Sequence, residues 1–155
     1  MSKQAPAQKT LATNRKARHL YTVIETVECG IELRGTEVKS VKSAQFSFSD
    51  SYAAIENGEL WLIGLHIALY DFGNVYNHDP LRRRRLLVHR DEIKKLKRHT
   101  DERGLTLVPL KFYLKRGLVK VELGICRGKK LYDKRESIKK KDLKRDADRE
   151  IRNRL

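Results

Sequence analysis

The sequence predicts a mainly β protein with two or three short helices, arranged as a small, partly open antiparallel β-barrel and followed by a basic C-terminal tail. Short stretches rich in β-branched, aromatic and other apolar residues alternate with turn residues along most of the chain. An Asn-Gly pair at 57–58 separates two of these stretches, which is typical of a β-hairpin. The chain has 155 residues, of which 39% are hydrophobic, and this content supports one core rather than two.

The N-terminal part predicts a leader, a strand and a helix. Residues 1–13 are small and polar without periodicity, so we expect a disordered leader. Residues 20–34 contain β-branched and aromatic residues with partial alternation, which predicts a strand in which Gly30 marks a bulge or a tight bend. Residues 36–42 predict a short helix, because Thr36 can cap its first turn.

The middle of the chain predicts a hairpin and a loop. Residues 51–56 and 59–63 flank Asn57-Gly58, and a type I′ turn requires positive φ angles at both of these turn residues. Residues 65–69 are expected to continue as a further strand. Residues 70–80 are rich in Asn, Asp and Gly and predict a loop.

The C-terminal half predicts one helix and two strands. A helix is expected at about 90–100, because acidic residues occupy its first turn and Gly104 ends it. Residues 105–114 and 118–126 predict two strands around a Lys-Arg-Gly turn. Pro109 lacks an amide proton and therefore indicates an edge position or a bulge in the first of them.

The composition changes after the last predicted strand. Leu143, Ala147, Ile151 and Leu155 recur every four residues and form one narrow apolar stripe among many cations. This stripe is too thin to hold a helix against a core, so we expect the tail to be disordered alone and helical when bound to a charged surface. The predicted organisation is a leader over 1–13, a barrel domain over 14–127 and a basic tail over 128–155.

Charge is segregated along the chain. The formal net charge is +15 and the isoelectric point is about 10.0. Residues 21–81 carry a net charge of −6, whereas residues 1–20 carry +5, residues 82–103 carry +6 and residues 127–155 carry +7. This distribution indicates a folded body that presents basic arms and a basic patch to a polyanion, most often nucleic acid and less often an anionic membrane.

Several functional classes lack support in the sequence. No run of about 18 apolar residues and no apolar signal-peptide segment occurs, so we expect a cytoplasmic protein without a membrane anchor. Cys29 and Cys126 form no disulfide framework and are expected to be reduced, buried and inert. The five histidines show no metal-ligand spacing and no catalytic motif appears, so we expect no metal, no cofactor, no small-molecule substrate and no enzyme.

Four features are candidates for contact with phosphates or bases. The run Arg82–Arg85 presents guanidinium groups suited to phosphate, with a solvated basic turn as the alternative. Residues 14–19 are either part of a basic face or a polar approach to the barrel. Glu28 and Glu37 can accept hydrogen bonds from base amino groups or ribose hydroxyls, or can serve as salt-bridge partners. Residues 128–135 join a glycine, cations and a tyrosine that can stack on a base, or form a solvated linker.

Five short motifs occur in an order that points to a known family. They are Asn14-Arg15-Lys16-Ala17-Arg18-His19, Gly35-Thr36-Glu37-Val38-Lys39-Ser40, Asp50-Ser51-Tyr52-Ala53, Asp79-Pro80 leading to Arg85-Leu86-Leu87, and Gly128-Lys129-Lys130 with Asp133-Lys134-Arg135. Over roughly residues 14–140 the chain resembles small protein B, the SsrA-binding protein family of bacteria. The resemblance implies an oligonucleotide-binding (OB-like) barrel and a non-enzymatic RNA-binding adaptor.

The resemblance also implies partners and site residues. It implies that the barrel binds the tRNA-like domain of transfer-messenger RNA (tmRNA) and that the complex enters stalled ribosomes for trans-translation, a form of ribosome rescue. It places Glu28, Leu87 and His89 on the RNA-binding face and the tail from Gly128 in the empty mRNA channel, beside the rRNA of the decoding region. The residues expected at the RNA surface are Asn14, Arg15, Lys16, Arg18, His19, Glu28, Gly35, Glu37, Lys39, Arg82, Arg83, Arg84, Arg85, Leu87 and His89. Those expected in the ribosome-binding tail are Gly128, Lys129, Lys130, Tyr132, Asp133, Lys134 and Arg135.

Three other functions stay open from the residues alone. A ribosomal protein whose basic ends thread rRNA fits the composition equally well. A metal-independent ribonuclease would need a histidine paired with a lysine or tyrosine, and no spacing indicates such a pair. Binding to an anionic membrane has less support, because the stripe in the tail lacks bulky aromatic residues.

Overall fold

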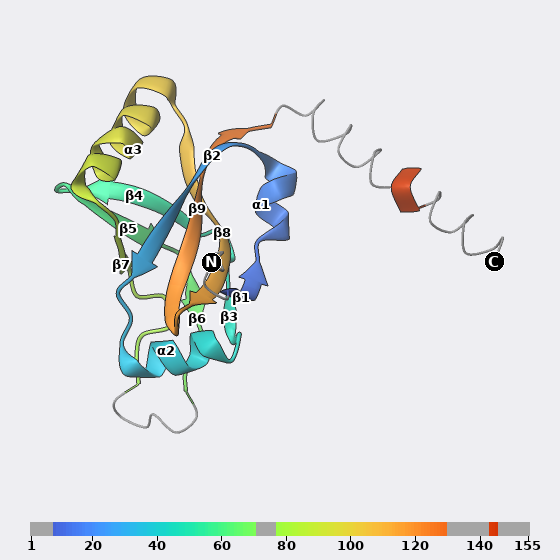
Figure 1. Ribbon diagram of the computed structural model, residues 1–155, viewed down its shortest axis with the longest axis vertical. Helices are drawn as coiled ribbons and strands as arrows, with labels where there is room; N and C mark the ends of the chain where they lie inside the picture. Colours follow the sequence, from blue (N-terminus) through green and yellow to red (C-terminus); the bar gives the residue numbers. More distant parts are fainter. Residues whose placement is uncertain (1–7, 71–76, 130–142, 146–155) are drawn as a thin grey trace, which may run out of the picture.

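Within residues 8–70 and 77–129, antiparallel strands dominate and three helices lie outside them (Figure 1). The computed structural model describes residues 8–70, 77–129 and 143–145. The strands are β1 (Gln8–Thr13), β2 (Tyr21–Ile31), β3 (Phe46–Ser47), β4 (Tyr52–Glu56), β5 (Glu59–Ile63), β6 (His66–Ile67), β7 (Arg84–Leu87), β8 (Thr106–Lys115) and β9 (Leu118–Gly128). The helices are α1 (Arg15–Leu20), α2 (Gly35–Lys42) and α3 (Arg90–Arg103).

Six of the strands close into a ring. Their order is β8-β4-β5-β7-β2-β9, and β9 returns to β8, while β1 pairs with the other edge of β8. Within the described residues, β4 meets β8 only where Ala53 faces Leu107, and β2 meets β7 at two residue pairs. The ring is therefore partly open at these two joints, and the predicted mainly β architecture is confirmed.

The interior of the ring forms the main hydrophobic core. Leu60, Phe112 and Leu123 are fully buried inside it. Val41 of α2 and Leu96 of α3 belong to the same core, and the two helices lie at opposite ends of the ring (Figure 1). Burial of these side chains from both ends stabilises the ring by the hydrophobic effect, at about 25 cal/mol per Å² of apolar surface.

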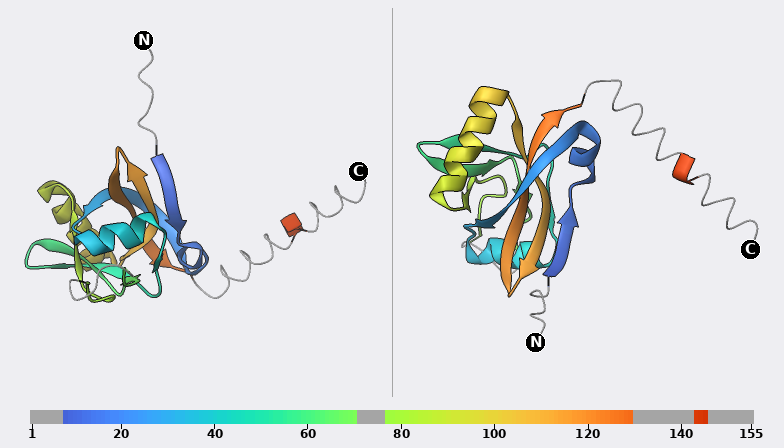
Figure 2. Two further views of the ribbon diagram at one scale, coloured as in Figure 1. Left: turned by 90° about the horizontal axis from the view of Figure 1, so that it is seen from below. Right: turned by 45° about the horizontal axis from the view of Figure 1, so that its top comes forward.

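A smaller apolar cluster lies on the outside of the sheet under α1. Ala17 packs there against Val108 and Leu110 of β8 and Cys126 of β9. Gly124 makes this approach feasible, because a Cβ at that position would stand only 2.6 Å from the Leu110 side chain. In Figure 2, α1 therefore appears outside the ring and across the molecule from α3.

Several predicted elements are confirmed. Asn57 and Gly58 have φ angles of 52° and 75°, as a type I′ turn requires, and they join β4 to β5. Gly104 has a φ of 61° and ends α3 in the left-handed conformation. The ladder between β8 and β9 shifts register between Pro109 and Lys111, which is the bulge that the proline indicated.

The N-terminal prediction is wrong in two places. Residues 8–13, expected in the leader, form β1, because pairing with β8 satisfies their backbone where the side-chain pattern gives no signal. Residues 15–20, for which the sequence analysis predicted no helix and which include Leu20 of the expected strand, form α1. Asn14 caps this helix by accepting a hydrogen bond from the Ala17 amide at 3.1 Å, and its own side-chain amide donates to the Pro109 carbonyl at 2.9 Å.

Three smaller expectations also need correction. Gly30 lies in a regular part of β2, and the bulge of this strand falls between Val23 and Glu25. Gly30 instead permits a close approach, because a Cβ there would stand 3.3 Å from the Leu87 Cβ. Of the strand expected at 65–69, only residues 66–67 form a strand, β6, which pairs with β3. Thr36 is not the cap of α2, which begins after Arg34, and its hydroxyl pairs with His78 instead.

The boundary between the barrel and the tail lies slightly later than predicted. Gly128 still pairs with Tyr21, and the Lys129 amide donates to the Leu20 carbonyl at 3.0 Å. Residues 143–145 are helical. The remaining predictions for the tail fall on residues 130–142 and 146–155, and those for the start of the leader on residues 1–7, all outside the described residues.

Candidate RNA interface

The outer surface of β2, β8 and β9 is half covered by α1 and half open. The open half is defined by strand register. Gly30 of β2 lies between Leu87 of β7 and Lys120 of β9, and Lys120 in turn faces Tyr113 of β8. Glu28 lies two residues before Gly30 and therefore projects from the same side of the sheet. We call this surface the open sheet face; it consists of Glu28, Gly30, Leu87, Lys111, Tyr113, Lys115 and Lys120.

Glu28 is an oriented carboxylate on the open sheet face. Its Oε1 accepts a hydrogen bond from the Tyr113 hydroxyl at 2.7 Å, and Lys115 Nζ lies 3.3 Å from both of its oxygens. The hydrogen bond from Tyr113 is the largest of the effects that hold the pKa of Glu28 below its ordinary value. Glu28 is thus ionised at neutral pH and 40% exposed, so its free lone pairs can accept from base amino groups or ribose hydroxyls.

Leu87 ends β7 opposite Gly30, and His89 follows two residues later as the N-cap of α3. The Leu87 side chain is 44% exposed and contributes to a shallow groove of about 230 Å³. Leu118 and Lys120 line the same groove, which combines an apolar floor with a cation. His89 Nδ1 accepts from the Asp91 amide at 3.3 Å and caps α3, while the ring itself stays exposed. The register therefore places Leu87 near Glu28, both predicted RNA-binding residues, while His89 stands two residues beyond Leu87 along the chain.

The sequence reasoning missed the aromatic and basic partners of this face. Lys111, Tyr113 and Lys115 occupy every second position of β8, and Lys111 Nζ lies 5.1 Å from the centre of the Tyr113 ring. This alternation in a predicted strand was the available signal, because alternate residues share one side of a sheet. Lys120 carried no comparable signal, since its place beside Gly30 depends on a pairing across the ring.

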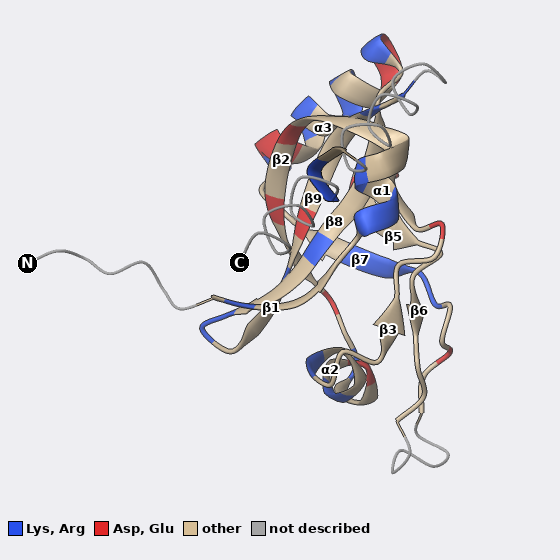
Figure 3. Ribbon diagram, turned by 90° about the vertical axis from the view of Figure 1, so that its right-hand side faces the viewer, with Lys and Arg blue, Asp and Glu red and all other residues tan. Residues whose placement is uncertain are grey.

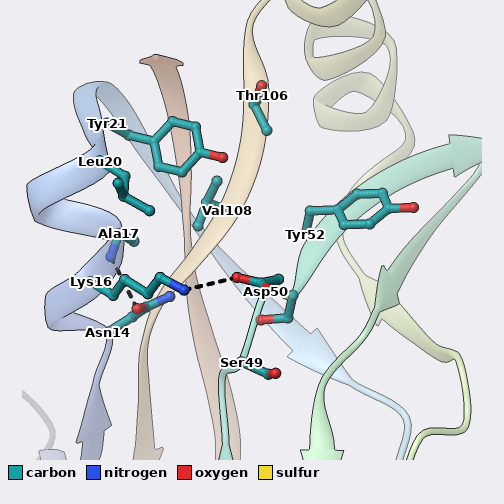
Figure 4. Close-up of a pocket in the computed structure, with 11 residues that line it drawn as sticks. Asn14, Lys16, Ala17, Leu20, Tyr21, Ser49, Asp50, Tyr52, Thr106 and Val108 are labelled. Atoms are coloured by element: carbon teal, nitrogen blue, oxygen red, sulfur yellow. Dashed lines mark hydrogen bonds and ion pairs between the residues drawn. The ribbon is translucent and has the colours of Figure 1, made fainter. Parts of the chain in front are cut away.

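The α1 segment forms a second basic face. Arg15, Lys16 and Arg18 are exposed, whereas Asn14 is buried as the helix cap and His19 is partly buried. Lys16 pairs with Asp50 at 3.0 Å (Figure 4). The segment thus lies on a basic surface, which was the first of the two interpretations that the sequence left open for residues 14–19.

A pocket of about 280 Å³ opens beside α1. Figure 4 shows Tyr21 and Tyr52 on its two sides, with Val108 between them and Lys16 reaching toward Asp50. Such a pocket offers aromatic rings for stacking and a polar rim, which suits an unstacked base.

The four arginines of the run Arg82–Arg85 form ion pairs with carboxylates of the fold. Each of Arg82–Arg85 has a carboxylate partner, and β7 appears as a basic strand in Figure 3. Arg84 has no exposed surface, contacts Glu37 through Nε and donates to the Leu65 carbonyl at 2.9 Å. Arg82 reaches the same carboxylate at 2.6 Å. The expected direct contact of these guanidinium groups with phosphate is therefore wrong for Arg84, and the other three are held in ion pairs with Glu37, Glu56, Glu32 and Glu59.

Glu37 is the centre of this ion-pair network rather than an RNA acceptor. It is fully buried in α2 and also accepts from the Arg34 backbone amide at 2.8 Å. Burial alone would raise the pKa of Glu37, but the hydrogen bonds from Arg82, the Arg34 backbone and Arg84 outweigh it and hold the pKa below its ordinary value. The interpretation of Glu37 as a salt-bridge partner is therefore confirmed, and the prediction that it contacts RNA is wrong.

The remaining predicted residues lie at the other end of the ring and in the tail. Gly35 and Lys39 are exposed on α2, and Lys39 Nζ lies 4.9 Å from the centre of the Tyr70 ring. Gly128 and Lys129 end the barrel. Lys130, Tyr132, Asp133, Lys134 and Arg135 lie outside the described residues.

The structure describes few groups suited to other chemistry. Burial raises the pKa of the Cys29 thiol to about 12 and that of Cys126 to about 11, so these two free, buried cysteines are poor nucleophiles. Among residues 8–70, 77–129 and 143–145, no three His, Cys, Asp or Glu side chains gather where a metal ion could bind. In the same part of the chain, no helix is long and apolar enough to span a bilayer.

Fold and surface together define a small β-ring protein with a basic exterior and one oriented carboxylate on an open sheet face. Comparison with known proteins then assigns the family. The family described as "SmpB protein" matches residues 11–153, and the chain belongs to this family.

Similar proteins share almost the whole chain. An "SsrA-binding protein" of Ligilactobacillus salivarius is 52% identical over 153 residues and covers 99% of both chains. An "SsrA-binding protein" of Treponema denticola is 53% identical over 144 residues, which are 93% of this chain and 94% of that one. A solved structure named "tmRNA-SmpB: a journey to the center of the bacterial ribosome" contains a chain that is 50% identical, with a TM-score of 0.65 over 77% of this chain and 85% of that one.

Proposed function

We propose that this protein is an RNA-binding adaptor that binds the tRNA-like domain of tmRNA and delivers it to stalled ribosomes for trans-translation. The relatives are named for binding SsrA, and the similar solved structure is named for a tmRNA–SmpB assembly on the ribosome. The observation in this chain that carries the proposal is the open sheet face, where an oriented carboxylate, an exposed leucine and several lysines stand together.

Each part of the open sheet face suits structured RNA. Lys111 and Lys120 supply positive charge for the sugar-phosphate backbone. The Glu28 carboxylate accepts from ribose hydroxyls or base amino groups, and Leu87 offers an apolar contact to an unstacked base. Structured RNA is recognised mainly by shape, ribose hydroxyls and unstacked loop bases, so this combination fits a folded, tRNA-like target.

A second surface is needed for the ribosome. The body and the tail each carry positive charge, and residues 127–155 alone contribute a net +7. We assign the tail, including Lys129, Lys130, Tyr132 and Lys134, to the ribosomal mRNA channel, beside the rRNA of the decoding region. The protein then acts by binding and not by catalysis, in the cytoplasm where ribosomes work.

Glu28→Gln tests the assignment of the open sheet face. The substitution keeps the size of the side chain but removes the charge that makes Glu28 a strong acceptor. Hydrogen bonds to charged groups contribute about 1.5–3 kcal/mol, so we expect affinity for the isolated tRNA-like domain to fall roughly tenfold or more. The dissociation constant is measured by isothermal titration calorimetry at fixed salt.

Glu102→Gln is the matched control for this measurement. Glu102 is exposed near the C-terminal end of α3 and is not part of the open sheet face, and its carboxylate has no hydrogen bond or ion pair in the described part of the chain. Loss of this negative charge should leave RNA affinity unchanged or slightly higher. Equal affinity of the Glu28→Gln variant and the wild type would contradict the assignment of the face.

Sequencing the RNA that co-purifies with the protein separates the adaptor from a structural ribosomal protein. An adaptor should carry one dominant structured RNA and leave ribosomal subunits in a high-salt wash. Retention on the subunits through that wash, with rRNA alone recovered, would contradict the adaptor function.

A further inference from the structure

The Tyr113 hydroxyl reaches Glu28 across an intervening strand. Tyr113 lies on β8 and Glu28 on β2, and both strands pair with β9. Neighbouring strands are about 4.8 Å apart, so β8 and β2 are separated by about 10 Å. The two side chains nonetheless meet, because the hydroxyl donates to Glu28 Oε1 at 2.7 Å. This bond therefore fixes the position of the Glu28 carboxylate relative to the sheet.

The Tyr113 side chain has almost no surface of its own to offer a ligand. Only 6% of the residue is exposed. Its neighbours in the strand register are Thr10 of β1 and Lys120 of β9, and Lys111 Nζ lies 5.1 Å from the centre of the ring. Burial raises the pKa of Tyr113 well above its ordinary value, so the hydroxyl keeps its proton and stays a donor. An effect of this hydroxyl on RNA binding therefore acts through Glu28.

The two carboxylate oxygens of Glu28 have different partners. Oε1 accepts from Tyr113 at 2.7 Å, and Lys115 Nζ lies 3.3 Å from it. Among the described residues, Oε2 has only the 3.3 Å contact with Lys115. A carboxylate group has about four lone-pair sites, so Oε2 retains an acceptor site for a donor from outside the protein. Tyr113 thus occupies one oxygen and leaves the other to RNA.

The charges around Glu28 increase the importance of this bond. Glu28 stands directly opposite Glu122 in the β2–β9 ladder, and like charges in that position repel each other. The hydrogen bond from Tyr113 is the largest of the effects on the pKa of Glu28 and lowers it, whereas burial raises it. The cations Lys115 and Lys120 lower it further. Without the bond, Glu28 would titrate at a higher pH and Lys115 alone would hold its side chain.

We propose that Tyr113 is a positioning residue for RNA recognition: it fixes the Glu28 carboxylate so that Oε2 stays free to accept from the RNA, and it does not touch the RNA itself. This inference rests on the proposed function of the open sheet face. A glutamate side chain that is already held before binding does not have to be ordered in the complex, so the cost in conformational entropy falls. Lys115 is a less selective probe of this effect, because its side chain is 28% exposed and can also meet a phosphate.

Tyr113→Phe in the full chain tests the proposal, because it removes the hydroxyl and keeps the ring. We expect affinity for the isolated tRNA-like domain to fall about three- to tenfold, which corresponds to the cost of ordering one flexible side chain on binding. Isothermal titration calorimetry at fixed salt measures this loss. In a Glu28→Ala background the same substitution should change affinity by less than about twofold, since no carboxylate is left to position. An equal loss in both backgrounds would indicate a role of Tyr113 that does not pass through Glu28 and would overturn the proposal.

A titration of the free protein gives an independent readout. The Glu28 carboxyl carbon is followed by nuclear magnetic resonance as the pH is lowered. Since the hydrogen bond favours the ionised form, Tyr113→Phe should move the titration midpoint of Glu28 to higher pH. An unchanged midpoint would overturn the proposal, because a purely structural role of the ring would leave it in place. The titration needs no RNA, so failure of the wild type to bind the tRNA-like domain would instead contradict the proposed function.

Thr10→Val is the matched control. Thr10 faces Tyr113 directly on β1, and its exposed hydroxyl has no hydrogen-bond partner in the described part of the chain. Valine is also β-branched and favours strands, so the substitution removes a neighbouring hydroxyl and keeps β1. Both RNA affinity and the Glu28 midpoint should stay at their wild-type values. Losses equal to those of Tyr113→Phe would attribute the effect to this region of the surface rather than to the bond with Glu28, and would overturn the proposal.

Discussion

Glu37 is the residue on which the arrangement of α2 and β7 depends most. Its carboxylate holds two arginines and a backbone amide, and both Glu37 and Arg84 are removed from solvent. Desolvation of two charges is costly, so such a pair stabilises the fold only while both partners are present. Arg84 also donates to the Leu65 and Pro80 carbonyls, which ties the segment after β5 to β7.

Glu37→Gln is expected to destabilise the protein strongly. Removal of one partner leaves the Arg84 charge buried and uncompensated, which costs about 3–5 kcal/mol in free energy of unfolding. Urea denaturation at neutral pH measures this change. Glu32→Gln removes an exposed partner of Arg85 and should cost no more than about 1 kcal/mol. Equal losses for the two variants would contradict the central role of Glu37.

The same carboxylate predicts a pH dependence of stability. The pKa of Glu37 is lower in the folded protein than its ordinary value of 4.5, so the folded state binds its proton more weakly than the unfolded state does. Its contribution is fully present above pH 4.5 and is lost as the pH falls through the lowered pKa. Thermal unfolding between pH 7 and pH 3 should show a steeper acid loss in the wild type than in Glu37→Gln. Parallel curves would contradict this origin.

At the scale of elements, local chemistry predicted some structures well and others not at all. The Asn57-Gly58 hairpin and the Gly104 end of α3 were predictable because a turn or a cap fixes backbone angles through its own residues. β1 and α1 were not, since they depend on contacts with β8 that lie about 95 residues away in the chain, such as the bond from Asn14 to Pro109. Asn14 itself was a usable signal for a helix start.

Gly124→Ala tests the packing of α1 on the sheet. The added Cβ would stand 2.6 Å from the Leu110 side chain and 3.0 Å from Cys126 Sγ, so the apolar cluster under α1 must shift. Overpacking of this kind costs about 1–3 kcal/mol, which thermal or urea unfolding detects. Gly128→Ala is the control, because nothing lies within 4 Å of a Cβ at that position. A Gly124→Ala variant as stable as the control would contradict the close packing.

At the scale of the whole molecule, the cations that make up the net charge of +15 fall into two groups. Some form ion pairs within the fold, as Arg84 does, and others, such as Arg15 and Arg18, are exposed on the surface. The run Arg82–Arg85 was the strongest basic signal in the sequence, yet each of its four arginines forms an ion pair with an acidic residue from the segment 21–81. The sequence could not predict this, because the partners lie up to 53 residues away and meet only when the ring closes. The candidate site was predictable at Glu28, Leu87 and His89 through family likeness, and strand alternation offered a signal for Tyr113 that was not used, whereas Lys120 had none.

The central claim is that a β body holds one RNA while the basic tail serves the ribosome. Truncation after Lys129 tests it, because this residue still bonds to the Leu20 carbonyl and so marks the end of the barrel. The most direct measurement compares two quantities for this variant: affinity for the tRNA-like domain and tagging of peptides on stalled ribosomes. We predict affinity within about threefold of wild type, since the open sheet face is intact, together with complete loss of tagging. A loss of RNA affinity greater than tenfold, or tagging at the wild-type level, would contradict the claim.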